Sequence, residues 1–283
     1  MSGTASRVFA RLAEAALTLA AAVVAGCVLI CAAPGTGMDE RELDLRLTEA
    51  DRDRIRAERD AERRFTVFLP RYLAALARGD LGVSESFNRP VAELLGERFP
   101  VTLRTAGGGL AAAWVAAGVL TAAAGRGRRG RWFGYLARAA SGSLLCIPAA
   151  LTGLLLVVWQ LPVWLGIAVV VFPKVFGPLD GVLSGAAGSG AVLAARARGA
   201  SPPAIVFRHM LWPRRRALAA LAAVSAPLAI GASVAVEAVT GTPGIGHLAW
   251  KATTSRDVVL LVGLTLVLTA VTLAVNTAAE VDG

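Results

Sequence analysis

Long runs of apolar residues recur along the chain, separated by polar segments. A helix needs about 20 apolar residues to cross the hydrocarbon core of a bilayer, and most of these runs approach that length. Helices of a water-soluble protein would instead alternate apolar and polar faces. The pattern predicts an all-α, polytopic membrane protein with about six transmembrane helices. The expected spans are residues 12–33, 101–124, 136–159, 163–176, 217–236 and 258–279.

Prolines interrupt two of the expected spans. Pro148 lies within the third, where we expect a kink, because proline removes a helical hydrogen bond. The fourth apolar run is short, contains Pro173 and is followed by Pro178. To cross the bilayer it must continue as a broken or tilted helix towards Ala195.

The first apolar run allows two interpretations. Arg7 and Arg11 precede it, and residues 24–27 resemble a bacterial lipoprotein cleavage box, so a cleaved signal peptide is one alternative. However, the run continues past Cys27 to Ala33, and further apolar runs follow. We therefore expect an uncleaved helix whose N-terminus stays in the cytoplasm.

The charge distribution predicts the topology. Residues 125–131 and 190–216 are short and strongly basic, so the positive-inside rule places both in the cytoplasm. Residues 34–98 carry 14 acidic residues and 12 arginines, and such a long segment is expected outside. Six spans then place both termini in the cytoplasm. The net charge of +9 forms no continuous basic face, so we expect no nucleic acid partner.

The sequence offers no convincing motif of catalysis or cofactor binding. Residues 125–130 match the letters G-x-G-x-x-G, but no strand precedes them and arginines fill the gaps, so we expect no dinucleotide site. The sequence contains no H-E-x-x-H, no G-x-S-x-G and no phosphate-binding G-x-x-x-x-G-K-[ST] loop. We therefore expect no enzyme activity, no cofactor and no metal, and any ATP must be hydrolysed by another polypeptide. Glu237 and Asp257 lie near the ends of expected spans, and membrane-buried charge otherwise looks nearly absent, which counts against a proton-driven carrier. The three cysteines are interpreted as apolar packing residues: Cys27, Cys31 and Cys146.

The second basic segment predicts a helix, a turn and a second helix. Gly199 can adopt the left-handed conformation that ends a helix. Ser201 is a suitable N-cap, and Pro202 suits the first position of the next helix, which we expect to end at Leu211. A short amphipathic helix held between spans suits the docking of a soluble partner.

This segment resembles the cytoplasmic loop of permease subunits of ATP-binding-cassette (ABC) importers of the dipeptide/oligopeptide type. In that branch the loop reads approximately T-A-R-A-K-G-L-S, followed by R-H. Further segments are similar to the same branch in the same order, so the resemblance covers nearly the whole chain. They are residues 79–84, 89–103, 237–246, 256–257 and Asn276.

The resemblance implies a type I ABC importer transmembrane domain. Residues 1–98 would form an N-terminal transmembrane helix with a charged extracytoplasmic segment, and residues 99–280 the permease domain. The implied function is one half of a pore for peptides, nickel chelates or another small solute, in a bacterial cell membrane. The implied partners are a second permease subunit, two cytoplasmic ATPase subunits, an extracytoplasmic solute-binding protein and the lipid bilayer. A non-transporting membrane scaffold or sensor is the alternative.

The same resemblance implies roles for individual residues. An extracytoplasmic gate or turn would involve Glu237, Pro243, Gly244 and Gly246. The loop that couples to the ATPase would comprise Ala195, Arg196, Ala197, Arg198, Gly199, Ala200, Ser201, Arg208 and His209.

The topology is testable with an impermeant thiol reagent. Cysteines introduced at Ser86 and Ser201 should be labelled from opposite sides of the membrane, because only the second lies in a short basic segment. Labelling of both from one side would contradict the six-span arrangement.

Overall fold

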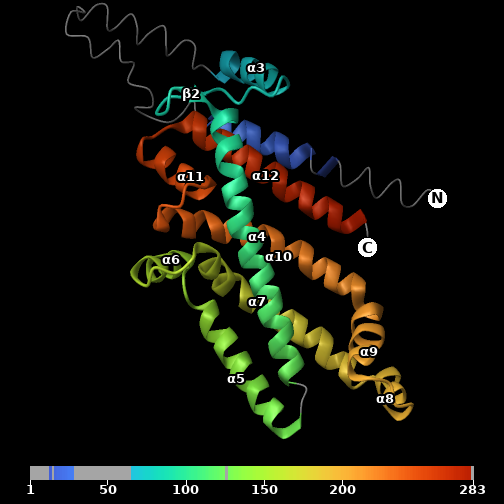
Figure 1. Cartoon of the computed structure of the whole chain (residues 1–283). Coiled ribbons are helices and arrows are strands. Elements are labelled where there is room, and N and C mark those ends of the chain that lie inside the picture. The colour runs from blue at the N-terminus through green and yellow to red at the C-terminus, as the bar shows by residue number, and fades with distance from the viewer. Residues whose placement is uncertain (1–12, 15, 29–64, 125–126, 282–283) are drawn as a thin grey trace, which may run out of the picture. The chain divides into compact units, whose positions relative to one another are not determined.

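The computed structural model describes residues 13–14, 16–28, 65–124 and 127–281 (Figure 1). The first expected span is therefore seen only as the short apolar helix Ala16–Val28. Residues 34–64 of the charged segment and Cys31 lie outside the described residues. Apart from one small hairpin, the described elements are helical, which confirms the all-α prediction.

The described chain consists of α-helices, one short hairpin and two irregular helical turns. The hairpin pairs β1 with β2 in antiparallel register, with Val83 opposite Pro90 and Ser84 opposite Arg89. Before α10 the chain passes through a π-helical turn, Ile205–Leu211, and a 3₁₀ turn, Trp212–Arg214. The elements are α3 (Phe65–Leu76), β1 (Val83–Ser84), β2 (Arg89–Pro90), α4 (Val91–Ala124), α5 (Gly127–Leu145), α6 (Ala149–Val158), α7 (Val163–Ala187), α8 (Gly190–Ala197), α9 (Pro202–Ala204), α10 (Arg215–Thr240), α11 (Ile245–Thr254) and α12 (Val258–Val281).

Four described helical segments are long and apolar enough to cross a membrane, and a fifth span exists if one bent pair is counted. Within the described residues the chain is thus a multi-pass membrane protein with four or up to five of the six expected spans. The second span begins earlier than residue 101, because α4 continues the helix back to Val91. The four segments are Val91–Ala124, Val163–Ala187, Ile205–Thr240 and Val258–Thr277.

The third expected span is broken rather than kinked. Segments Trp132–Leu145 and Ala149–Val158 meet at an angle of 100°. Pro148 is the N-cap of α6, with φ −61° and ψ 141°, so the backbone is extended there. Proline also disfavours helical geometry at the residue before it, so the chain can turn sharply between the two helices. The prediction found the place of the interruption but underestimated its size.

The fourth expected span is complete. Helix α7 runs for 25 residues through Pro173 and Pro178, about 37 Å of helix, and ends at Gly188. The helix continues past residue 176 as expected, but it is not broken and it does not extend to Ala195, since α8 begins separately at Gly190. Proline is tolerated within spanning helices when neighbouring groups compensate for the lost hydrogen bond.

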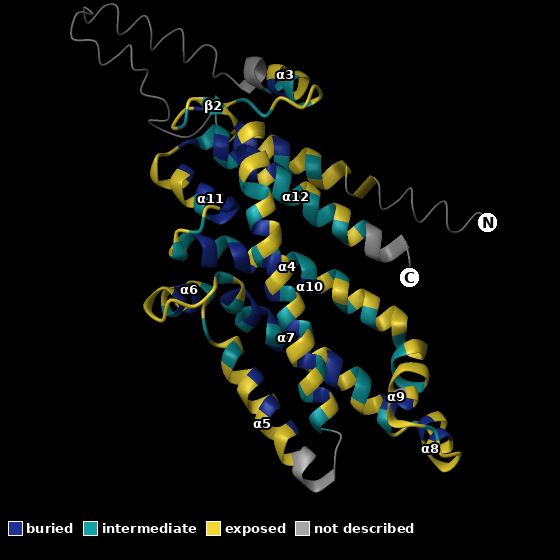
Figure 2. Ribbon diagram, in the orientation of Figure 1, coloured by how far each residue is buried: buried dark blue, intermediate teal, exposed yellow. Residues whose placement is uncertain are grey.

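The chain divides into two compact units, residues 1–99 with 248–273 and residues 100–247 with 274–283. The second unit is built around α7, whose buried positions appear dark blue in Figure 2. Gly109 of α4 packs against it so closely that a Cβ would lie 2.7 Å from the Ile167 side chain and 2.9 Å from the Trp164 carbonyl oxygen. Side chains of α4, α5, α6, α7 and α10 share this core: Ala106, Ala113, Ala117, Ala137, Leu156, Ile167, Val171, Val175, Phe176, Leu179, Ala229, Ala232 and Val236.

The first unit has a small apolar cluster of its own. Cys27 is fully buried there with Val262 and Tyr72, which confirms its interpretation as a packing residue. Burial, followed by the proximity of Cys27 and Asp80, raises the pKa of Tyr72 to about 12. Cys146, in the second unit, is exposed, so the same interpretation is wrong for that cysteine.

Asp257 joins the β1–β2 hairpin to the start of α12 within the first unit. The carboxylate is 1% exposed and accepts hydrogen bonds from the Ser84 hydroxyl at 2.5 Å and from the Ser86 amide and hydroxyl at 3.0 and 2.8 Å. Its other oxygen caps α12 by accepting from the Leu260 amide at 3.0 Å. Burial alone would raise the pKa of Asp257, but these hydrogen bonds outweigh it and hold the pKa below its usual value.

Replacing Asp257 should therefore destabilise the protein. Asp257→Ala should lower the free energy of unfolding by about 2–4 kcal/mol, because it removes a helix cap and leaves the buried Ser84 hydroxyl without its acceptor. Asp257→Asn should cost less, since it keeps one acceptor oxygen. Thermal unfolding of the detergent-solubilised protein measures both, and equal Tm values for the three proteins would exclude this role.

The pH dependence follows from the lowered pKa. The carboxylate stabilises the folded state above its unfolded pKa of about 4, and the contribution is lost as the pH falls through the lower folded pKa. The difference in Tm between the wild type and Asp257→Asn should thus shrink on acidification below pH of about 4.

Candidate functional site

The turn after α8 is a Schellman motif centred on Gly199. Gly199 has φ +74°, as its sequence context predicted. The amide of Ala200 bonds to the carbonyl of Ala195 at 3.1 Å, and the amide of Gly199 to that of Arg196 at 3.0 Å. Ala195 forms a small buried apolar cluster with Val192 and Ile205, and Ala200 packs against this cluster. The local chemistry of a helix C-terminus therefore fixes the position of this turn.

The second helix of this loop differs from the expected one. Ser201 occupies the N-cap position and Pro202 the first helical position, but the Ser201 side chain makes no capping hydrogen bond. The helix does not end at Leu211. It continues as a π-helical turn and a 3₁₀ turn directly into α10, so that Ile205–Thr240 forms one helical segment. A separate short amphipathic helix is therefore not present.

The loop presents an apolar and basic surface. Leu193, Phe207 and Trp212 are 56%, 68% and 66% exposed. The guanidinium of Arg215 stacks over the Trp212 ring at 5.1 Å. Of the nine residues predicted for the coupling loop, Ala195 is buried, Ala200 and His209 are half-buried, and six are exposed: Arg196, Ala197, Arg198, Gly199, Ser201 and Arg208.

A fully buried carboxylate lies at the other end of α10. Glu237 is 0% exposed. It accepts hydrogen bonds from the hydroxyls of Thr102 and Thr105 at 2.9 and 2.6 Å and from the amide of Gly246 at 3.0 Å. Thr102 also accepts a bond from the amide of Ile245 at 2.8 Å. These bonds tie α4, α10 and the start of α11 together around one charge, and they satisfy it away from water.

The turn between α10 and α11 requires glycine for two reasons. Gly241 ends α10 in the left-handed conformation, with φ +68°. At Gly244 a Cβ would collide with the Glu237 carboxylate and with Thr102 Oγ1 at 2.6 Å. At Gly246 a Cβ would lie 2.7 Å from Val234 Cα. The structure thus brings together Glu237, Gly244 and Gly246 of the predicted gate or turn, whereas Pro243 is exposed beside them. We call the set of Glu237, Gly244, Gly246, Thr102 and Thr105 the Glu237 turn.

Sequence analysis missed the threonine partners and a second buried charge. Thr102 and Thr105 lie 135 and 132 residues from Glu237. Thr102 falls in the segment 89–103 that resembles the family, but no local pattern indicates that either threonine contacts Glu237. Asp180 of α7 is 7% exposed and pairs with Arg138 of α5, at 2.9 Å to Nε and 2.8 Å to Nη2. The expectation that membrane-buried charge is nearly absent was therefore wrong, because α7 extends past Pro178.

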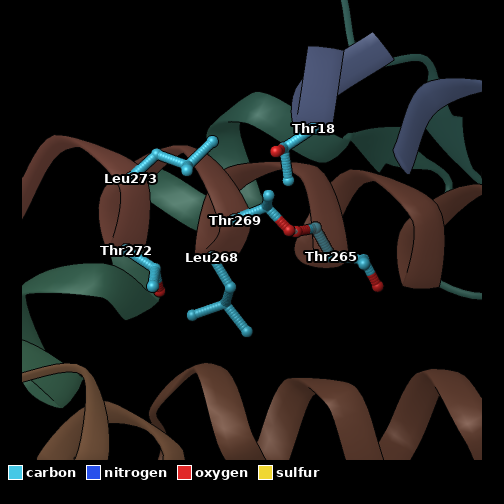
Figure 3. A pocket seen from close by; sticks show the side chains of 6 residues that line it. All are labelled: Thr18, Thr265, Leu268, Thr269, Thr272 and Leu273. Atoms are coloured by element: carbon cyan, nitrogen blue, oxygen red, sulfur yellow. The ribbon is translucent and has the colours of Figure 1, made fainter. Parts of the chain in front are cut away.

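The first unit contains a shallow pocket of about 330 Å³ (Figure 3). Two of the threonines that line it donate their hydroxyl hydrogens within their own helix. The Thr265 hydroxyl donates to the carbonyl oxygen of Leu261, and the Thr269 hydroxyl donates to the carbonyl oxygen of Thr265. The pocket therefore presents mainly methyl groups, and it contains no predicted site residue. Its lining consists of Thr18, Thr265, Leu268, Thr269, Thr272 and Leu273. Among the described residues, no group of three or more potential ligands could hold a metal ion.

Comparison with known proteins decides the family. Residues 114–281 match the family described as the binding-protein-dependent transport system inner membrane component. The chain belongs to this family. It is therefore a permease component of a binding-protein-dependent ABC transport system, a class of membrane proteins that work with ATPase and substrate-binding partners.

Two relatives of this permease come from Brucella. One from Brucella suis biovar 1 and one from Brucella ovis, both provisionally named peptide permeases, are each 27% identical to it over 279 residues. Each alignment covers 88% of this permease and 87% of the relative. The match extends over most of both chains, so the resemblance to the peptide branch is confirmed.

The close packing at Gly246 predicts that Gly→Ala destabilises the permease at this position but not at Gly231 in the interior of α10. Gly246→Ala should destabilise the permease by about 3 kcal/mol or more, because its methyl group meets backbone that cannot rotate away. Gly231→Ala, in the interior of α10 where nothing lies within 4 Å of the added methyl group, should be neutral or stabilise by up to about 1 kcal/mol. Thermal unfolding in detergent compares them, and similar Tm values would contradict the close packing.

Proposed function

We propose that this permease forms half of an ATP-driven import path for peptides or similar small solutes, paired with a second, homologous permease. The observation that carries the proposal is the continuous segment Ile205–Thr240. It joins the exposed loop around Gly199 to the buried carboxylate of Glu237. The names of the two Brucella relatives support peptides as the solute class.

The loop has the features of a docking site for a cytoplasmic ATPase. Phe207 and Trp212 are large apolar side chains left exposed beside several arginines. Aromatic residues and arginine are enriched at protein interfaces. The nine predicted coupling residues, Ala195–Ser201 with Arg208 and His209, line this surface or support it. Movement of a docked ATPase would pass directly into α10, because no flexible linker separates the loop from the spanning helix.

The Glu237 turn would act at the other end of α10. A helix of 26 residues is about 39 Å long, which is enough to place the loop and the turn on opposite sides of a bilayer. The basic loop would be cytoplasmic and the turn extracytoplasmic, where a solute-binding protein would dock. The bonds from Thr102 and Thr105 would carry a shift of α10 to α4.

The setting proposed for the chain is a bacterial cell membrane. Both termini would lie in the cytoplasm, residues 1–98 would add a first transmembrane helix and an extracytoplasmic segment, and residues 99–280 would form the permease domain.

In the thiol-labelling test of the topology, the extracytoplasmic cysteine is better introduced at Val83, which is 54% exposed, than at Ser86. Both the amide and the hydroxyl of Ser86 donate hydrogen bonds to Asp257, so a cysteine there would disturb that site.

A substitution at Gly199 tests the coupling role. Valine at φ +74° strains the backbone by about 1–2 kcal/mol or more, and this should displace the turn that positions the docking surface. Apart from Gly199 and its two chain neighbours, no atom of the described residues lies within 4 Å of the added Cβ, so the rest of the permease should fold normally. Gly199→Val should keep its membrane level, recover at least tenfold less ATPase on purification and abolish uptake.

Gly190→Val is the matched control. Gly190 also has open space around it, but its φ is not positive, so ATPase recovery and uptake should remain near the wild-type level. Gly199→Asn should retain more function than Gly199→Val, since asparagine tolerates the left-handed conformation. Normal ATPase association together with normal uptake in Gly199→Val would refute the coupling role.

A further inference from the structure

Helix α7 carries a lysine near its centre. Lys174 is the twelfth of the 25 residues, about 17 Å of helix from Val163 and about 20 Å from Ala187. A lysine side chain is much shorter than either distance. Unlike a cation near a helix end, Lys174 therefore cannot extend its ammonium group to the headgroup region.

The described side chains of the second unit offer Lys174 no counter-charge. Asp180 is paired with Arg138, and Glu237 is surrounded by its own donors. Lys174 is exposed, and among the described residues no carboxylate lies within ion-pair distance of it. A cation left unpaired in a spanning helix requires either water or an anion from outside the chain.

On the C-terminal side of Lys174, the same face of α7 carries glycines instead of larger side chains. Gly177, Gly181 and Gly185 follow at spacings that keep them on the side of Lys174, and all three are exposed. Within the described part of the chain, a Cβ added to any of them would meet no atom within 4 Å beyond the backbone of α7 itself. Pro178, also exposed on this side, has no N–H to offer the carbonyl of Lys174. Ammonium and carbonyl groups that lack partners are costly against lipid but are hydrated in a water-filled path.

We propose that this face of α7 lines the solute path and that Lys174 binds a carboxylate of the transported solute there. The inference rests on the proposed function, since it takes the permease to import a solute. A peptide ends in a carboxylate, which complements the single positive charge of lysine. The glycines leave room beside it, so the main chain of a peptide can lie along the helix.

A different occupant would give a different experimental result. Glycines at a spacing of four also allow two spanning helices to pack closely. A helix of the second permease could cover this face and supply an acidic partner for Lys174. In that case the face would be closed to water, and neutral substitutions of Lys174 would weaken assembly of the two permeases.

Thiol labelling separates these two possibilities without any assumption about the solute. In a variant with Cys27, Cys31 and Cys146 replaced by alanine, Lys174→Cys in the assembled transporter should react with a membrane-impermeant, negatively charged methanethiosulfonate. Val171→Cys is the matched control on the same helix, because Val171 is 0% exposed and should not react. Absence of labelling in Lys174→Cys would overturn the inference.

Uptake then tests the carboxylate. Vesicles that contain the complete transporter, with excess solute-binding protein, are given labelled trialanine or its C-terminal amide. Lys174→Met should lower the ratio of acid to amide uptake at least tenfold, and Lys174→Arg should restore part of it. Lys251→Met, at the exposed lysine of α11, should leave the ratio unchanged. An equal fall for both peptides would overturn the inference.

The two proposals fail in different ways. If the wild type imports neither peptide, the assignment of peptides in the proposed function fails, whereas labelling at position 174 still decides whether this face of α7 meets water. If the wild type imports both peptides and Lys174→Met keeps the same ratio, the permease is a peptide importer and the role given to Lys174 is wrong.

Discussion

The buried carboxylate of Glu237 imposes the constraint on which the second unit depends. A charge removed from water must be surrounded by donors, and here they come from α4 and from the start of α11. The helices must therefore approach within hydrogen-bond distance, and the turn between α10 and α11 must pass directly over the carboxylate. The glycines of that turn and the threonines of α4 meet this single electrostatic requirement.

Polar satisfaction also explains why the spans depart from uniform apolar helices. Asp180 is tolerated in α7 because Arg138 of α5 donates a hydrogen bond to it from Nε and forms an ion pair with it. Lys174 receives no such compensation from the described residues, and the proposed solute carboxylate would supply it. The buried face of α7 packs against other helices of the second unit, and the opposite face carries Lys174 and the exposed glycines.

Local chemistry made part of this structure predictable from the sequence. Apolar runs predicted α4, α7, α10 and α12 as spans, and the left-handed Gly199 followed from the chemistry of a helix C-terminus. The angle at Pro148 was not predictable, because proline interrupts a helix while packing sets its new direction. The pair of Asp180 with Arg138 and the bonds to Glu237 join residues far apart in the chain, so no spacing rule revealed them.

The contacts at Gly246 have a consequence for how this sequence can diverge. Every replacement of glycine adds at least a Cβ, and here that atom would meet the backbone of Val234, which no change of rotamer removes. Gly244 is constrained in the same way by the Glu237 carboxylate and Thr102. Positions 102, 237 and 244 can thus change only together, whereas position 246 is restricted to glycine by backbone that no side-chain replacement moves. The exposed apolar positions of the spans can change one at a time.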